Sequence, residues 1–152
     1  MAEIHVSEER SISAPAATVY GLIADYRRHH PKFLPANFSK YEVQEGGVGA
    51  GTVVQFRLKA GGRDRMYRVQ ITEPEPGRVL QEADTLSTAV TTFTVIPEDG
   101  TSRVRIDTTW QGAGGVGGFF ERTFAPRVLR SLYADELERL DTYARSQSSQ
   151  ST

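Results

Sequence analysis

The sequence contains no cysteine, which excludes disulfide bonds, thiol nucleophiles and zinc sites with cysteine ligands. It also has no stretch of the roughly 20 apolar residues that a membrane-spanning helix needs. Residues 1–5 show neither the basic residues nor the apolar run that begin a secretory signal peptide. We therefore expect a soluble, cytoplasmic protein without a membrane span.

An excess of charge of one sign is also lacking, since 18 basic and 19 acidic residues give a net charge of -1. A nucleic-acid-binding domain is usually strongly basic, so we predict no nucleic-acid partner. One local basic group straddles an expected hairpin tip, where charges usually form a solvated face; a phosphate site is the alternative. This group consists of Arg57, Lys59, Arg63, Arg65 and Arg68. Arginine outnumbers lysine, which we associate with a bacterial source.

The length of 152 residues suits one ordinary domain, and hydrophobic periodicity divides the chain into strands and helices. Alternating apolar residues predict a first strand at 3–13, then a short helix at 16–24 and one or two further helical turns before Pro31. From residue 38 the period of two returns, interrupted by short turns rich in glycine and proline. We expect six more strands, at 38–45, 52–59, 67–71, 79–83, 89–96 and 104–110. Consecutive short strands with tight turns indicate an antiparallel meander.

The last part of the chain changes to a helical period. Apolar residues recur at helical spacing over residues 119–143, which predicts one long amphipathic helix with Glu136 on or near its solvent side. Pro126 lies inside this pattern and should kink the helix or separate its first turn from the rest. The polar tail, residues 146–152, is expected to be disordered, so residues 1–145 form the single predicted domain.

Several short sequence motifs, each of low specificity alone, occur together in a specific order. They are Ile12-Ser13-Ala14-Pro15 with Val19-Tyr20 and Asp25, then Gly47 to Thr52, Glu75 to Arg78, Phe93 to Pro97 and Gly100 to Val104. In this order the chain resembles the polyketide cyclase/dehydrase-like branch of the START-related (SRPBCC) superfamily, over residues 3 to about 145. The resemblance implies an α+β helix-grip fold, in which a seven-stranded antiparallel sheet wraps around a long C-terminal helix, with two short helices after the first strand. In that fold an apolar ligand cavity lies between sheet and helix.

Side-chain parity predicts which residues face such a cavity. The residues expected on the concave face of the sheet are Phe56, Leu58, Tyr67, Val69, Thr91, Phe93, Thr108 and Trp110. The mouth would be formed by Tyr26, His30 and Phe33, and the long helix would close the cavity with Phe120, Thr123 and Phe124. For each aromatic residue, simple core packing is the alternative to ligand contact.

Candidates for acid–base chemistry in the cavity are Tyr67, His30, Glu8 and Arg10. Glu8 and Arg10 share the parity of the apolar face of the first strand, so they should either form a structural ion pair or orient a ligand. His30 has an ordinary pKa near neutrality, which suits a general acid or base; a surface histidine is the alternative. Glu82 or Asp84, near a strand end, is a further candidate for the base.

The segment Gly112 to Gly117 matches the pattern GxGxxG between the last strand and the long helix. A dinucleotide site also needs a following parallel strand with an acidic residue, and the chain ends with the helix instead. We interpret the segment as a flexible joint beside the cavity mouth. The three histidines are too scattered for a metal triad, so we predict no cofactor and no metal.

Three classes of function follow from a cavity of this kind. We favour binding of a small, largely apolar ligand of lipid, polyketide or aromatic type, because no inward-facing pair of acid and base is unambiguous. The alternative is a cyclase or dehydratase that uses no cofactor and acts on a poly-carbonyl chain through proximity and acid–base groups. The third reading, a co-chaperone-like interaction module, would need an exposed apolar patch. We expect a monomer or a homodimer.

Overall fold

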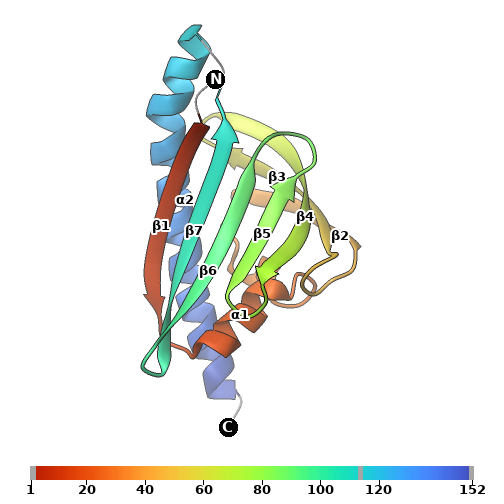
Figure 1. The fold of residues 1–152 in the computed structure, drawn as a ribbon, viewed down its shortest axis with the longest axis vertical. Coiled ribbons are helices and arrows are strands. Elements are labelled where there is room, and N and C mark those ends of the chain that lie inside the picture. Colours follow the sequence, from red (N-terminus) through yellow and green to blue (C-terminus); the bar gives the residue numbers. More distant parts are fainter. Residues whose placement is uncertain (1–2, 113–114, 151–152) are drawn as a thin grey trace.

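A computed structural model describes residues 3–112 and 115–150, and for residues 115–124 and 148–150 it describes the backbone only. The element order is one strand, two short helices, six strands and one long helix (Figure 1). The strands are β1 (Glu3–Ile12), β2 (Phe38–Glu45), β3 (Val53–Ala60), β4 (Arg63–Glu75), β5 (Val79–Asp84), β6 (Val90–Glu98) and β7 (Thr101–Gln111). The helices are α1 (Ala16–Ala24), the 3-10 helix η1 (His30–Phe33) and α2 (Gly115–Gln150).

All seven strands form one antiparallel sheet in the order β1-β7-β6-β5-β4-β3-β2. Strands β2 to β7 pair with their neighbours in the chain, as the meander prediction requires, and β1 pairs with the last strand. Figure 1 shows that the sheet is curved, that α2 runs along its length behind β1 and β7, and that α1 lies at one end. The helix-grip fold that the resemblance implies is therefore confirmed.

The core lies between the concave face of the sheet and α2. Leu80, Phe93 and Ile106 are opposite one another on β5, β6 and β7, and each is buried. Leu137 and Leu140 of α2 belong to the same buried cluster. Burying side chains of this size contributes roughly 1.5–3 kcal/mol each, so this contact fixes the helix on the sheet.

Helix α2 differs from its prediction in three respects. It continues without a break through Pro126, so its first turn is not separated from the rest, because turns on both sides can hold a helix that lacks one backbone N–H. It begins at Gly115, so part of the predicted glycine-rich joint is helical, while residues 113–114 lie outside the described residues. It continues to Gln150, into the tail predicted to be disordered, since propagation adds a hydrogen bond for each residue. No helix in the described part of the chain is long and apolar enough to cross a membrane.

Candidate functional site

A cavity of about 520 Å³ lies between the concave face of the sheet and α2. Its volume falls within the range of small-molecule sites. Residues predicted to contact a ligand that do line the cavity are Tyr26, Phe56, Leu58, Tyr67, Val69, Thr91, Phe93, Thr108 and Trp110. Phe33 is not among the lining residues, because its buried ring packs behind His30, with the ring centroids 4.7 Å apart. The side chains of Phe120, Thr123 and Phe124 lie outside the described residues.

A polar row crosses the concave face of the sheet. Thr108 is opposite Thr91, and Thr91 is opposite Glu82, so the three side chains lie on the same face. The hydroxyls of Thr91 and Thr108 are hydrogen bonded at 2.8 Å, and Thr108 is bonded at 2.5 Å to the hydroxyl of Tyr133 on α2. The row therefore connects α2 to a carboxyl group in the cavity wall.

The turn between α1 and η1 places two aromatic rings beside this row. Asp25 ends α1, and its carboxylate accepts the backbone N–H groups of Arg27 and Arg28 at 3.2 and 2.9 Å, which caps the following turn. The backbone N–H of His30 donates to the carbonyl of Asp25 at 2.8 Å. As a result the rings of Tyr26 and His30 are stacked with their centroids 4.3 Å apart.

A short hydrogen bond in the cavity wall beside these rings joins Tyr26 to Glu82. The Tyr26 hydroxyl donates to Glu82 Oε2 at 2.6 Å. Burial raises the pKa of Glu82 to about 7, against a smaller lowering by this hydrogen bond. The pKa of Tyr26 is well above its ordinary value, because the ring is buried and faces the Glu82 charge. Glu82 therefore changes its protonation state near neutral pH while Tyr26 keeps its proton, which suits a group that accepts and returns a proton.

His30 lies beside Glu82, but its surroundings keep it neutral. Its Nδ1 is 2.7 Å from the Ile23 carbonyl oxygen, so Nδ1 carries the hydrogen and Nε2 carries the lone pair. Burial lowers the pKa of His30 to about 4. Nε2 lies 3.7 Å from Glu82 Oε2, which is too far for a hydrogen bond, and with a neutral ring this contact is not an ion pair. His30 thus contributes a hydrogen-bond acceptor and no positive charge.

Glu136 of α2 is a second acid in the cavity wall, and its predicted place on the solvent side is wrong. The residue is only 3% exposed. Among the described residues its carboxyl has no hydrogen-bond or ion-pair partner. Burial raises the pKa of Glu136 well above its ordinary value, and the charge of Glu82 acts in the same direction. A buried carboxyl without a partner in the described part of the protein is available to a ligand.

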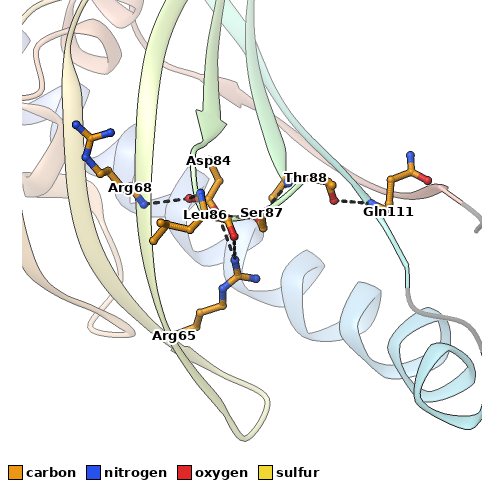
Figure 2. A network of polar contacts seen from close by, with 8 residues as sticks. Arg65, Arg68, Asp84, Leu86, Ser87, Thr88 and Gln111 are labelled. Atoms are coloured by element: carbon orange, nitrogen blue, oxygen red, sulfur yellow. Dashed lines mark hydrogen bonds and ion pairs between the residues drawn. The ribbon is translucent and has the colours of Figure 1, made fainter.

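A polar network around Asp84 holds the end of the cavity at which lining residues are exposed, and we call this end the mouth (Figure 2). Tyr26, His30 and Phe33, which were predicted to form the mouth, are buried instead. The Asp84 carboxylate accepts hydrogen bonds from the Arg68 backbone N–H at 3.0 Å, the Leu86 backbone N–H at 3.3 Å, the Ser87 hydroxyl at 2.6 Å and the Arg65 guanidinium at 3.2 Å. These partners occupy both carboxylate oxygens. Asp84 therefore fixes the loop between β5 and β6, and of the two acids considered as a base, Glu82 has the suitable surroundings.

Tyr67 lies nearer the mouth than the buried acids. Its ring is stacked on Phe56 with centroids 5.5 Å apart, and the Arg65 guanidinium lies 4.8 Å from the ring centroid. Burial raises the pKa of the Tyr67 hydroxyl. In the described part of the chain no carboxylate or histidine is hydrogen bonded to that hydroxyl. The contacts of Tyr67 are those of a flat wall for a ligand, and its catalytic role stays a prediction.

Glu8 and Arg10, the other two candidates for acid–base chemistry, do not line the cavity. Arg10 is exposed, and its Nη2 lies 3.6 Å from Oδ2 of Asp141 on α2. The other oxygen of Asp141 accepts the Ser13 backbone N–H at 2.8 Å. This end of β1 approaches α2, so Arg10 forms a structural ion pair with the helix instead of with Glu8.

The basic group at the hairpin of β3 and β4 is largely neutralised by neighbouring acids. Its ion pairs are Arg57 with Asp64, Lys59 with Asp64 at 3.8 Å, Arg65 with Asp84 at 3.2 Å and Arg68 with Glu45 at 3.8 Å. This arrangement is the solvated face that the sequence favours. No group of three acidic or histidine side chains able to hold a metal ion occurs in the ranges 3–112 and 125–147.

Several cavity residues were missed by the sequence analysis, among them Tyr41, Tyr133 and Glu136. The signal for Glu136 is its spacing of four residues from Leu132 and from Leu140, which puts it on the buried stripe of α2. Tyr133 belongs to the same side of the helix. For Tyr41 the sequence offers no comparable signal, since its inward position depends on a hydrogen bond from its hydroxyl to the Tyr26 carbonyl at 2.6 Å.

Comparisons with known proteins support the architecture described above. The KanY protein, known from a solution structure, is 38% identical, with a TM-score of 0.85 over 95% of this chain and 99% of that chain. TTHA0849 from Thermus thermophilus is 20% identical, with a TM-score of 0.76 over 95% and 99% of the two chains. The Zhui aromatase/cyclase from Streptomyces sp. R1128 is 18% identical, with a TM-score of 0.75 over 95% and 94%. A search of curated proteins finds no match.

The family comparison covers nearly the whole fold. Residues 3–145 match the family described as polyketide cyclase / dehydrase and lipid transport. The matched range includes all seven strands, both short helices and the part of α2 that lines the cavity. The chain therefore belongs to the polyketide cyclase / dehydrase and lipid transport family.

Proposed function

We propose that this protein binds a small, largely apolar molecule of lipid, polyketide or aromatic type in the cavity, with a polar end of the ligand beside Glu82 and Glu136. The observation that carries the proposal is the Glu136 carboxyl, which is buried in the wall of a mainly apolar cavity without a partner among the described residues. Buried polar groups are almost always hydrogen bonded to protein or water, so this carboxyl can take a ligand atom as its partner. The family description, which includes lipid transport, agrees with a binding role.

Trp110 provides a direct test, because it is the single tryptophan of the chain and lines the cavity. Titration with the neutral probe N-phenyl-1-naphthylamine should quench Trp110 emission and saturate with one site. Val69→Phe, which fills the cavity from β4, should weaken probe binding by about tenfold or more, since it removes apolar contact area. Val48→Phe, at an exposed position outside the cavity, should leave binding unchanged. Equal affinities for the two variants would contradict the proposal.

A second candidate function, acid–base catalysis of ring closure, is favoured by the contact between Tyr26 and Glu82. As a carboxylate, Glu82 would remove a proton from a carbon between two carbonyl groups of a poly-carbonyl substrate. The resulting enolate carbon would attack a second carbonyl, forming the ring bond, and the new alkoxide would take the proton back. Loss of water then gives the unsaturated ring. A pKa near 7 lets Glu82 take both roles at neutral pH.

Incubation with a synthetic poly-β-carbonyl thioester, followed by mass spectrometry, tests this candidate. A catalytic cavity should give a cyclised product that has lost one water. Glu82→Gln should lower the rate by about a hundredfold or more, the usual effect of losing a general base, while Glu138→Gln on the exposed side of α2 should not. Tight binding of the thioester without any product above background would leave the binding function alone.

The interaction-module reading has less support. Large apolar residues that are exposed in the described part of the chain are Val48, Leu86 and Ile96. They lie in three different segments: the turn between β2 and β3, the loop between β5 and β6, and β6 itself. Single exposed apolar residues are normal on soluble proteins, so they do not indicate a docking patch.

A further inference from the structure

We propose that the inner end of the cavity binds a protonated amine between Glu82 and Glu136, so that the natural ligand is an apolar molecule with a basic nitrogen at one end. The inference rests on the proposed binding function and goes further by naming the charge of the ligand's polar group. It follows from the polar side chains around the inner end, which is the part of the cavity lined by Glu82, Glu136, Tyr26, His30 and Tyr133.

Two acids face this end from opposite sides of the cavity. Glu82 projects from β5 in the sheet, and Glu136 projects from α2. Glu136 is buried, and only 12% of the Glu82 side chain is exposed. The two acids come together through the polar row: Thr91 is opposite Glu82, Thr108 is opposite Thr91, and Thr108 is bonded to Tyr133, which lies one helical turn before Glu136. Glu82 already accepts the Tyr26 hydroxyl, whereas Glu136 has no hydrogen-bond or ion-pair partner among the described residues. A group that lies between them would contact two carboxyl groups at once.

No positive charge of the described residues balances these acids. His30, from η1, is neutral, because its Nδ1–H is used by the Ile23 carbonyl and its burial opposes protonation. Arg65, from β4, is paired with Asp84 at the mouth. Arg63 also lines the cavity, but it is an exposed residue at the beginning of β4, beside the hairpin tip.

The other polar groups that face the inner end are uncharged, and two nearby acids that do not line the cavity are paired elsewhere. Tyr41 donates its hydroxyl to the Tyr26 carbonyl, and the Thr108 and Tyr133 hydroxyls bond one another. Asp25, on the far side of the turn, accepts backbone N–H groups, and Asp135 on α2 pairs with Arg139. The inner end thus holds an excess of acid, and a cationic ligand group would supply the missing opposite charge.

Aromatic rings complete a site of this kind. The inner wall includes the stacked pair Tyr26 and His30, the edge contact of His30 with Phe93, and the ring of Tyr133. Faces of phenol and benzene rings attract cations, and the attraction increases when water is excluded. An amine on an apolar body therefore matches both the acids and the walls, with its apolar body directed toward Trp110 and Tyr67.

The proton balance gives the proposal a distinctive signature. Free in solution at pH 7, an alkylamine carries its proton, while burial keeps Glu136 in its neutral form. When the ammonium group enters, a carboxylate is favoured beside it, so Glu136 gives its proton to the buffer. Binding of an amine should therefore release protons. A neutral ligand that accepts a hydrogen bond from the protonated acid should release none.

The test compares two ligands of nearly equal shape, 2-naphthylmethylamine and 2-naphthalenemethanol, by isothermal titration calorimetry at pH 7 in buffers of different ionisation enthalpy. The amine should bind at least about tenfold more tightly than the alcohol and release up to about one proton. Glu136→Gln keeps the shape of the side chain but has no charge, so it should reduce both the preference and the proton release, and the double variant Glu82→Gln/Glu136→Gln should abolish them. Glu138→Gln, at an exposed glutamate further along α2, should retain both.

Each outcome of this test has a definite meaning. If both ligands bind equally, or the alcohol binds more tightly, the amine site is wrong while the proposed binding function stands. The same holds if the preference for the amine is undiminished in Glu136→Gln with the fold intact by circular dichroism. If neither ligand binds and N-phenyl-1-naphthylamine fails as well, the binding function itself is wrong, and the amine site with it.

Discussion

Glu82 and Asp84 lie two residues apart on β5 and line the same cavity, yet their neighbours differ. Asp84 is surrounded by donors, including two backbone N–H groups, a hydroxyl and a guanidinium. Glu82 has one donor, the Tyr26 hydroxyl, and otherwise faces buried aromatic and apolar groups. Two carboxyl groups on one strand therefore have separate uses: one fixes a loop and the other can exchange a proton.

This difference gives a prediction for stability as a function of pH. The folded-state pKa of Glu82 is raised to about 7 from an ordinary value of 4.5, so the folded protein holds a proton that the unfolded chain loses earlier. Its contribution is present below pH 4.5 and is lost as the pH rises through 7. Relative to Glu82→Gln, the wild type should lose up to about 3 kcal/mol of unfolding free energy between pH 4.5 and 8. Urea denaturation at several pH values measures this difference.

The comparison with the variant is needed because His30 acts in the opposite direction. Its folded-state pKa is lowered to about 4 from 6.5, so His30 favours the folded state more as the pH rises from 4 to 6.5. In the wild type alone the two effects partly cancel over that window. The His30 contribution is common to both proteins, and it drops out of their difference. Curves for wild type and Glu82→Gln that stay parallel from pH 4.5 to 8 would show that Glu82 is ionised in the folded state.

At the scale of elements, α2 has two apolar surfaces with different structural roles. Leu137 and Leu140 are buried against the sheet, whereas Val128 and Leu129 line the cavity. The hairpin tip of β3 and β4 also reaches α2, since a Cβ atom at Gly61 would lie 2.9 Å from Val128. The first surface holds the helix in place, and the second shapes the space for a ligand.

Truncating one leucine on each surface should distinguish the two roles. Leu140→Ala leaves a void in a close-packed region and should lower the free energy of unfolding by about 2–5 kcal/mol. Leu129→Ala borders a cavity that already exists, so it should lower stability less and change probe affinity more. Urea denaturation and Trp110 fluorescence titration of both variants measure the two quantities. Similar losses of stability for the two variants would contradict the assignment of different roles to the two surfaces.

Helix α2 also shows which structural features hydrophobic periodicity alone can predict and which it cannot. The apolar repeat predicts the long helix and its orientation toward the sheet, because burial of an apolar stripe is a local pattern. Glu136 has the spacing of that stripe, but glutamate is rarely buried, so its residue type predicts a solvent-exposed position. Its burial depends on the cavity, which forms only when α2 and β5 come together. Arg10 is a similar case, since its partner Asp141 lies far along the chain.

For the whole molecule, the sequence predicts the fold better than the chemistry. Strand alternation predicts the concave-face residues on β3, β4, β6 and β7, since antiparallel pairing keeps opposite residues on one face. The acid–base contact of Tyr26 with Glu82 joins a turn after α1 to the centre of the sheet, and no local pattern contains it. Residue types indicate which side chains could carry acid–base chemistry, and the pairing of distant elements determines which of these side chains come into contact.

The pairing of β1 with β7 has a consequence for the order of events during folding. Strands β2 to β7 each find a partner next to them in the chain, but the register of β1 joins Ile4 to Trp110. During synthesis, β1 leaves the ribosome first and must wait until β7 has followed it. We therefore expect β1 to be the last strand added, because closing so long a loop is slow. Because β1 also contacts α2, the helix that covers the cavity gains its full support only when β1 has paired with β7.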